Sequence, residues 1–94
     1  MPDHYLYIMA SQKNGTLYIG VTHDLKRRVY EHKHEIIKGF TSKYHVHNLV
    51  YFEVHASHWD AAEREARMKK WKRDWKIDLF KDANPEWEDL YDKI

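Results

Sequence analysis

Two short tyrosine-containing segments on either side of an Asn-Gly pair are the feature that most constrains the fold. The segments are Tyr5-Leu6-Tyr7 and Tyr18-Ile19-Gly20, and the Asn14-Gly15 pair lies between them. Asn-Gly is a strong hairpin signal because both residues tolerate the positive φ angles of a tight turn. We therefore predict a β-hairpin that brings Tyr7 and Tyr18 side by side on one face of a sheet.

Side-chain alternation along the first strand predicts two different sheet faces. Tyr5, Tyr7 and Met9 share one face, whereas Leu6 and Ile8 lie on the other. We expect the aliphatic face to form the core and the tyrosines to face something else. Tyrosine is also a common strand residue with a polar tip, so ordinary strand chemistry is the alternative explanation.

The rest of the chain predicts helices around a third strand. Cap-type residues precede a first helical pattern, Gly39 stops it, and a polar loop over residues 40–44 follows. The expected elements are a helix at 25–36, a strand at 48–54 and a second helix from about 60 to about 80. Asp24 precedes the first helix, and Ser57 or Asp60 can cap the second. The predicted fold class is therefore α+β, with a small three-stranded antiparallel sheet flanked by helices in a single domain, 1–94.

Composition limits the classes of function. The chain has 94 residues and no cysteine, so neither disulfides nor thiolate metal ligands are available, which fits a reducing compartment. Residues 1–4 carry no secretion signal, and no apolar run reaches the length of a membrane span. We expect a soluble cytoplasmic protein. Its net charge of +1 argues against binding nucleic acid by bulk electrostatics alone.

Three charged or titratable side chains are predicted beside apolar stripes, where charge is unusual. Arg28 and His32 lie one turn apart at the apolar stripe of the first helix, which includes Ile36. Glu65 borders the core-facing stripe of the second helix, which includes Trp75. Arg28 could instead snorkel from the core edge, with His32 as a core histidine. Glu65 could pair with Arg64 or Lys72, or it could bind a hard cation such as Mg²⁺.

Two further patterns bear on metal binding and on the end of the chain. His45-Val46-His47 suggests zinc, but the sequence offers no further ligands beside it. Asn84-Pro85 predicts a turn after the second helix, and Trp87 and Leu90 are expected to pack back on the domain.

Taken in order, these motifs resemble the GIY-YIG nuclease family. They look closest to its small stand-alone bacterial members, similar to the amino-terminal domain of excinuclease C. The resemblance makes Tyr7 and Tyr18 the two motif tyrosines and Gly20 the glycine of the second motif. The sequence departs from the family name at one place, because Tyr5-Leu6-Tyr7 stands where Gly-Ile-Tyr is usual.

The resemblance also implies a reaction and assigns roles. It implies hydrolysis of DNA phosphodiester bonds with a single Mg²⁺ or Mn²⁺ ion on Glu65. The enzyme would recognise the structure of the DNA, or would recognise its sequence only weakly. Arg28 would hold a phosphate oxygen, and one of Tyr7 and Tyr18 would take the proton from water. His32 would assist proton transfer or hold its neighbours in place. Which tyrosine is the base stays open.

The predicted contacts to DNA are Lys26, Arg27, Lys43 and Asn84. A protein partner could supply specificity, because no residues are left for a separate recognition domain. One alternative is a catalytically weak nucleic-acid-binding module of DNA repair or recombination. Another is a structural partner domain that uses Trp59, Trp71, Trp75 and Trp87 as contact anchors.

Overall fold

The predicted hairpin forms one half of a three-stranded sheet. A computed structural model describes residues 3–94, with strands β1 (His4–Ala10), β2 (Leu17–Thr22) and β3 (Asn48–His55) in the order β2-β1-β3. β1 is antiparallel to both neighbours. Of the Asn-Gly pair, only Asn14 takes a positive φ, 63°, and the Gly15 amide donates to the Gln12 carbonyl at 2.9 Å. The sequence therefore identified both the turn and the pairing.

Both faces of the sheet are buried, which corrects the expectation that only the aliphatic face forms core. On one face, Leu6 and Ile8 pack with Met68 and Phe80. On the other, Tyr7 and Met9 are 1% and 0% exposed and pack with aliphatic side chains that follow β2. Helices cover each face of the sheet, so Tyr7 has no access to bulk solvent.

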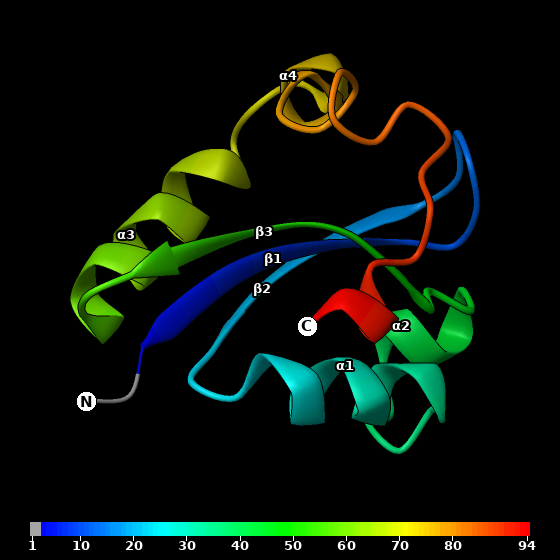
Figure 1. Ribbon diagram of the computed structural model, residues 1–94, viewed down its shortest axis with the longest axis horizontal. Helices are drawn as coiled ribbons and strands as arrows, with labels where there is room; N and C mark the ends of the chain where they lie inside the picture. The colour runs from blue at the N-terminus through cyan, green and yellow to red at the C-terminus, as the bar shows by residue number, and fades with distance from the viewer. Residues whose placement is uncertain (1–2) are drawn as a thin grey trace.

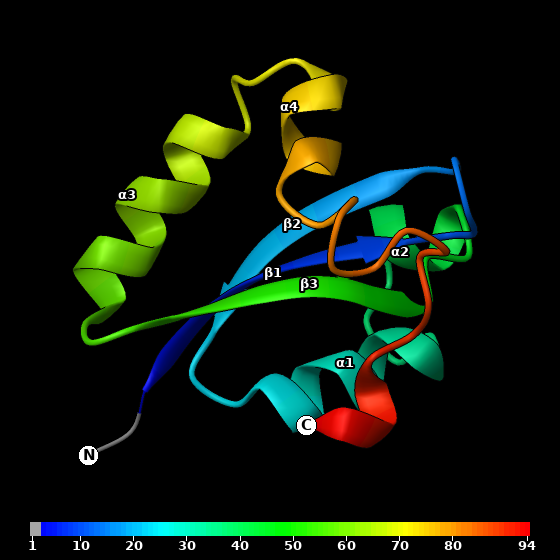
Figure 2. The ribbon, with the colours of Figure 1, turned by 45° about the horizontal axis from the view of Figure 1, so that its top comes forward.

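The helices divide between the two sides of the sheet. α1 (Leu25–Lys33) and α2 (Phe40–Lys43) lie on one side, and α3 (His58–Met68) and α4 (Arg73–Asp78) lie on the other (Figure 1 and Figure 2). Side chains cap two of them as the sequence indicated. Asp24 accepts from the Arg27 amide at the start of α1, and Ser57 accepts from the Asp60 amide at the start of α3.

The first predicted helix ends earlier than expected, and the predicted loop after it is partly helical. α1 stops at Lys33 because Glu35 takes a φ of 54°, and the Ile36 amide donates to the Glu31 carbonyl at 2.9 Å. Ile36 is therefore 58% exposed rather than part of the buried stripe. The short helix α2 occupies most of the expected loop at 40–44.

The second predicted helix is two helices. The chain leaves helical geometry after Met68 and takes an extended conformation at Lys72, with φ −62° and ψ 151°. This break lets Phe80 return to the core beside Met68, whereas a continuous helix would carry Phe80 away from it. Trp75 is accordingly 52% exposed, so the predicted core stripe does not extend to it.

The carboxyl-terminal segment passes from one side of the sheet to the other across the beginning of β3, as Figure 2 shows. Trp87 packs in the core beneath α3, whereas Leu90 packs against the core beneath α1. The Leu90 amide donates to the Leu49 carbonyl at 2.8 Å, and Asp89 accepts from the Leu49 amide at 3.0 Å. The tail therefore packs back as predicted and protects an edge strand.

None of the helices in residues 3–94 is both long enough and apolar enough to span a membrane. The prediction of no secretion signal in residues 1–4 includes Met1 and Pro2, which lie outside the described residues.

Candidate active site

Tyr7 lies at the centre of the sheet, where the neighbouring strand makes room for its ring. Tyr7 is in register with Gly20 of β2. A Cβ atom added at Gly20 would lie 2.5 Å from the Tyr7 hydroxyl oxygen and 2.6 Å from the Tyr7 Cζ atom. Real Cβ atoms do not approach other atoms so closely. Glycine is therefore required at position 20 by the packing of the Tyr7 ring.

A buried chain of hydrogen bonds leads from Tyr7 through α1 to α2. The Tyr7 hydroxyl oxygen lies 2.9 Å from His32 Nε2, and His32 Nδ1 lies 2.9 Å from the Thr41 hydroxyl oxygen. His32 is 2% exposed and Thr41 is 3% exposed. Each ring nitrogen of His32 thus has one partner, as a buried imidazole requires. These bonds fix the orientation of the imidazole ring against Tyr7.

Tyr18 lies beside this chain and borders an open groove. Its ring centroid is 6.2 Å from that of Tyr7 and 5.4 Å from that of His32, and Phe40 of α2 stacks against it at 6.1 Å. The groove has a volume of about 350 Å³ and is lined by Leu17, Tyr18, Ile19, Phe40, Lys69 and Lys76. Tyr18 is partly exposed, and within residues 3–94 its hydroxyl makes no hydrogen bond. The two motif tyrosines therefore differ in access to solvent.

Arg28 presents an unpaired donor next to the tyrosines. Among the described residues, Arg28 Nε is the one buried side-chain nitrogen or oxygen without a hydrogen-bond partner. It lies 3.3 Å from a Glu31 carboxylate oxygen, but that contact lacks hydrogen-bond alignment, so the pairing is electrostatic only. The guanidinium is close enough to Tyr7 to oppose the rise in its pKa. A buried donor without a partner is costly and often marks a position for an anion.

Burial dominates the proton equilibria of this site. It raises the pKa of Tyr7 well above the ordinary value, and the neighbouring Tyr18 raises it further. Burial, reinforced by the positive charge of Arg28, lowers the pKa of His32 to about 4. Near neutral pH, Tyr7 is therefore protonated and His32 is a neutral imidazole. Together they form a neutral hydrogen-bonded pair beside a fixed positive charge.

Glu65 of α3 approaches the same place from the other side of the sheet. Its partner is Lys69, at 3.3 Å, rather than either predicted partner. Arg64 instead binds Glu53 of β3 at 3.0 Å, and no ion pair joins Glu65 to Lys72 within residues 3–94. The Glu65 carboxylate is near enough to raise the pKa of Tyr7. Lys69 also lines the groove beside Tyr18, so the Lys69 side chain lies between Glu65 and that groove.

A single carboxylate of this kind suits a hard divalent cation. The Glu65 side chain is 22% exposed, and Mg²⁺ in proteins commonly takes one or two carboxylates and keeps several waters. The Lys69 side chain that pairs with it is 56% exposed, so this ion pair is weak and readily displaced. The donor set therefore fits a single hard ion. It would be held at the edge of the groove.

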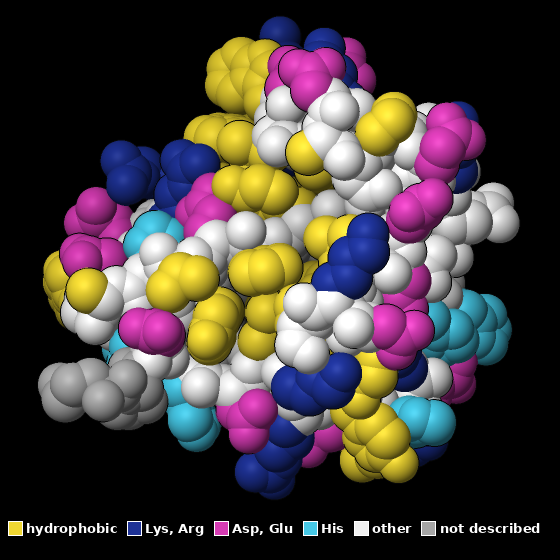
Figure 3. Space-filling view, viewed as in Figure 1, with side chains coloured by type: hydrophobic (Ala, Val, Ile, Leu, Met, Phe, Trp, Pro, Cys, Tyr) yellow, Lys and Arg dark blue, Asp and Glu magenta, His cyan; other side chains and the backbone are white. Residues whose placement is uncertain are grey.

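The four predicted DNA contacts lie in different surroundings. Lys26 donates to the carbonyls of Tyr91 and Ile94 at 3.1 Å and 3.3 Å, on the opposite side of α1 from Arg28. Arg27 is exposed and pairs with Glu31 at 3.3 Å. Lys43 is exposed on α2, the helix that carries Thr41. Basic and acidic side chains intermingle on the face that Figure 3 shows, so that face carries no continuous positive surface.

Asn84, the fourth of them, uses its polar atoms within the protein. It is 7% exposed. Its side-chain nitrogen donates to the carbonyls of Val50 and Glu88, and its oxygen accepts from the Glu88 amide at 2.8 Å. These bonds give Asn84 a structural role in the turn that precedes Trp87. The Asn-Pro motif therefore orders the chain at this point.

Sequence reasoning missed two residues that the fold adds to the site. Thr41 supplies the second partner of His32, and Phe40 supplies the stacking surface for Tyr18. Both belong to the segment predicted as a loop. A buried histidine needs a partner for each ring nitrogen, so the alternative of His32 as a core histidine implied a second hydrogen-bond partner close to it.

Comparison with known proteins identifies similar sequences. Residues 3–78 match the family model described as the GIY-YIG catalytic domain. A UPF0213 protein of Staphylococcus saprophyticus is 30% identical over 83 residues, which cover 88% of this chain and 100% of the relative. A UPF0213 protein of Bacillus pumilus is 33% identical over 78 residues, which cover 83% and 78% of the two chains.

A solved structure supports the fold independently. The solution NMR structure of a UPF0213 protein from Bacillus halodurans superimposes with a TM-score of 0.55 at 27% sequence identity. The match covers 94% of this chain and 93% of the other. The likeness confirms the predicted α+β class with a three-stranded antiparallel sheet.

Proposed function

The chain belongs to the GIY-YIG family, and on this premise we propose that it is a divalent-metal-dependent endonuclease that hydrolyses phosphodiester bonds in DNA. The observation that carries the proposal is the unpartnered, buried Arg28 Nε beside Tyr7, Tyr18 and His32. A catalytic domain for phosphate cleavage needs fixed positive charge where negative charge develops, together with a group that accepts a proton.

Arg28 is the proposed phosphate ligand. Its guanidinium is held at one end by the helix and by the charge of Glu31, so its orientation is largely fixed before substrate binds. The planar donors of arginine match phosphate oxygens, and charge-assisted hydrogen bonds of this type are among the stronger ones in proteins. A bound phosphate oxygen would supply the partner that Nε lacks.

We assign the two tyrosines different roles. Tyr18 is partly exposed and borders the groove, so its phenolate form is the proposed acceptor of the proton from the attacking water, which returns Tyr18 to the neutral phenol. Tyr7 is buried, bonded to His32 and held protonated by its raised pKa, so it is a positioning residue. Its ring and the His32 ring fix the face of Tyr18 that meets the substrate.

Glu65 is the proposed ligand of a single Mg²⁺ or Mn²⁺ ion. Such an ion, when bound, stabilises negative charge on phosphate oxygens. Displacing Lys69 from Glu65 would leave that lysine in the groove, where it could follow the sugar-phosphate backbone. A net charge of only +1 supports weak rather than tight electrostatic binding of DNA, and we propose low sequence specificity.

The test is cleavage of labelled single-stranded, duplex and branched DNA in Mg²⁺ or Mn²⁺. We expect Glu65→Gln and Arg28→Gln each to reduce the cleavage rate by at least about 100-fold, as loss of a transition-state contact does. Tyr18→Phe should reduce it by about 10²–10⁴-fold. Tyr7→Phe should have a smaller effect on cleavage, because its hydroxyl acts through His32.

Two neighbouring variants serve as matched controls. Glu63→Gln removes an exposed carboxylate from the same helix as Glu65, and Arg67→Gln removes the exposed guanidinium that pairs with Glu63. Both should cleave at the wild-type rate. Equal losses in the control and site variants would refute the site assignment. Salt-sensitive DNA binding with no cleavage in either metal would instead identify a binding module.

A further inference from the structure

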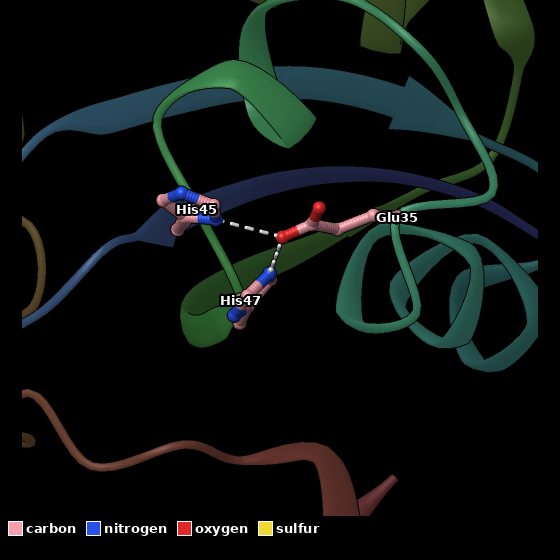
Figure 4. Close-up of side chains that lie close together, drawn as sticks. All are labelled: Glu35, His45 and His47. Atoms are coloured by element: carbon pink, nitrogen blue, oxygen red, sulfur yellow. Dashed lines mark hydrogen bonds and ion pairs between the residues drawn. The ribbon is translucent and has the colours of Figure 1, made fainter.

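A second group of metal-ligating side chains lies at the ends of α1 and α2, outside the residues that line the groove. The carboxylate of Glu35 meets His45 and His47, as Figure 4 shows. One oxygen, Oε2, lies 2.8 Å from His45 Nδ1 and 2.8 Å from His47 Nε2. All three ligand atoms lie within 4.8 Å of one another. The fold therefore supplies the further ligand that the sequence did not show beside His45 and His47.

Two residues in a left-handed backbone conformation, which is unusual for their residue types, bring these side chains together. Glu35 and His45 both have a φ of 54°, and each directly follows the C-cap residue of a helix. Both ends close in the same way: the Ile36 amide donates to the Glu31 carbonyl, and the Val46 amide donates to the Thr41 carbonyl. Glycine is the preferred residue at such a left-handed position. Here a carboxylate and an imidazole occupy the two positions, and they point toward each other (Figure 4).

We propose that Glu35, His45 and His47 bind one Zn²⁺ ion, separately from the ion proposed for Glu65. Two imidazoles and one carboxylate are a known ligand set for zinc, with the fourth position left to water. Imidazole nitrogens select zinc-type ions over Mg²⁺, which prefers oxygen ligands. Tetrahedral zinc would hold the ligand atoms about 3.3 Å apart. The two contacts of Glu35 Oε2 would therefore open by about 0.5 Å, and the two imidazole nitrogens, which lie within 4.8 Å of each other, would take the same separation.

The cluster is open to an incoming ion. The side chains of Glu35, His45 and His47 are 33%, 73% and 35% exposed. Hydrogen bonds between groups this exposed contribute little to stability on their own. The hydrogen bonds alone therefore do not explain why Glu35 and His45 both adopt a left-handed backbone conformation. A shared metal ion accounts for the convergence of all three.

A bound ion would join two segments that the catalytic domain depends on. Glu35 lies three residues after His32, and His45 lies four residues after Thr41. The His32–Thr41 hydrogen bond is the direct link between α1 and α2 in the proposed active site. A zinc ion would link α1 and α2 at their carboxyl-terminal ends.

Isothermal titration of the metal-free full chain with ZnCl₂ tests the proposal. We expect one Zn²⁺ per chain, with a Kd in the micromolar range or tighter. Loss of an outer-shell partner alone weakens a metal site about 10–100-fold, so His47→Gln and Glu35→Gln should each weaken binding by at least about tenfold. In NMR spectra of the wild type, the ring nitrogens of His45 and His47 should shift on zinc addition.

Matched variants separate this site from other surface histidines. His34→Gln and His23→Gln remove exposed histidines that make no hydrogen bond with Glu35 within the described residues, and they should leave zinc affinity unchanged. Glu65→Gln should also leave it unchanged. Zinc binding that persists in His47→Gln and Glu35→Gln, or no binding at 1 mM ZnCl₂, would overturn the proposal.

Discussion

Replacing Gly20 with alanine tests the packing on which the proposed active site depends. The backbone at Gly20 has an ordinary φ, since Gly39 is the one glycine of the described residues with a positive value. On conformational grounds alone, Gly→Ala at such a position stabilises a protein by about 0.4–1 kcal/mol. The contact with Tyr7 predicts the opposite sign.

The size of the clash decides between these effects. The new methyl group would lie 2.5 Å from the Tyr7 hydroxyl oxygen and 2.6 Å from Cζ, inside a face of the sheet where Tyr7 is 1% exposed. Overpacking of this kind costs about 1–3 kcal/mol. Displacing Tyr7 also breaks its buried hydrogen bond to His32, at a further cost of about 1–3 kcal/mol. After subtraction of the conformational gain, we therefore expect Gly20→Ala to destabilise the protein by about 1–5 kcal/mol.

Urea denaturation followed by tryptophan fluorescence measures this change, and a second substitution identifies its origin. In a Tyr7→Leu background the ring is gone, so Gly20→Ala should be neutral or slightly stabilising. In a Tyr7→Phe background the Cζ contact at 2.6 Å remains, so most of the steric cost should persist. The coupling energy between Gly20→Ala and Tyr7→Leu should be at least about 1.5 kcal/mol.

The outcome that would refute this reasoning is a stabilised Gly20→Ala protein, or an equal cost of Gly20→Ala with and without the Tyr7 ring. Either result would mean that the glycine is not there to admit the tyrosine. Cleavage should fall along with stability, because a shifted Tyr7 releases His32 and the face of Tyr18 that it supports.

Two further predictions concern pH and charge. The pKa of His32 is lowered to about 4, below the unfolded value of 6.5, so the unfolded chain binds the extra proton and the folded protein is less stable in acid. Between about pH 7.5 and about pH 5 the free energy of unfolding should fall by about 2 kcal/mol more in the wild type than in His32→Gln, as measured by urea titration at each pH. Burial raises the pKa of Glu53, but hydrogen bonds from Arg64, Tyr51 and His55 outweigh it and leave the pKa below its ordinary value. Arg64→Met should therefore cost about 1–3 kcal/mol near neutral pH, and the cost should shrink as acid protonates Glu53; an equal cost at pH 7 and pH 3 would contradict this.

The hairpin and the helix starts could be predicted from the sequence because each depends on residues close together in the chain. Asn14 and the alternating strands predicted the hairpin, and side-chain oxygens at Asp24 and Ser57 predicted helix starts. The ordered motifs also predicted which residues meet, and the structure brings Tyr7, Tyr18 and His32 into direct contact. Their chemical roles remain predictions for the cleavage assays.

The ends of the helices and the break between α3 and α4 were harder to predict from the sequence, because tertiary packing determines them. Nothing between Met68 and Lys72 is a strong helix breaker, yet the chain leaves the helix there so that Phe80 reaches the core. Similarly, Glu35 adopts a left-handed conformation that its residue type disfavours. In both places the energy of long-range contacts exceeds the local preference of the chain.

The sequence by itself determined the strand pairing, the starts of the main helices and the order of the family motifs, since each depends on residues close together in the chain. Only the tertiary structure decided that both sheet faces are buried and that Arg28 Nε has no hydrogen-bond partner among residues 3–94. It also decided that Lys69 rather than Arg64 pairs with Glu65, and that Glu35 joins His45 and His47. Burial and charge pairing depend on what surrounds a side chain in space. Those surroundings come from segments that lie far apart along the chain.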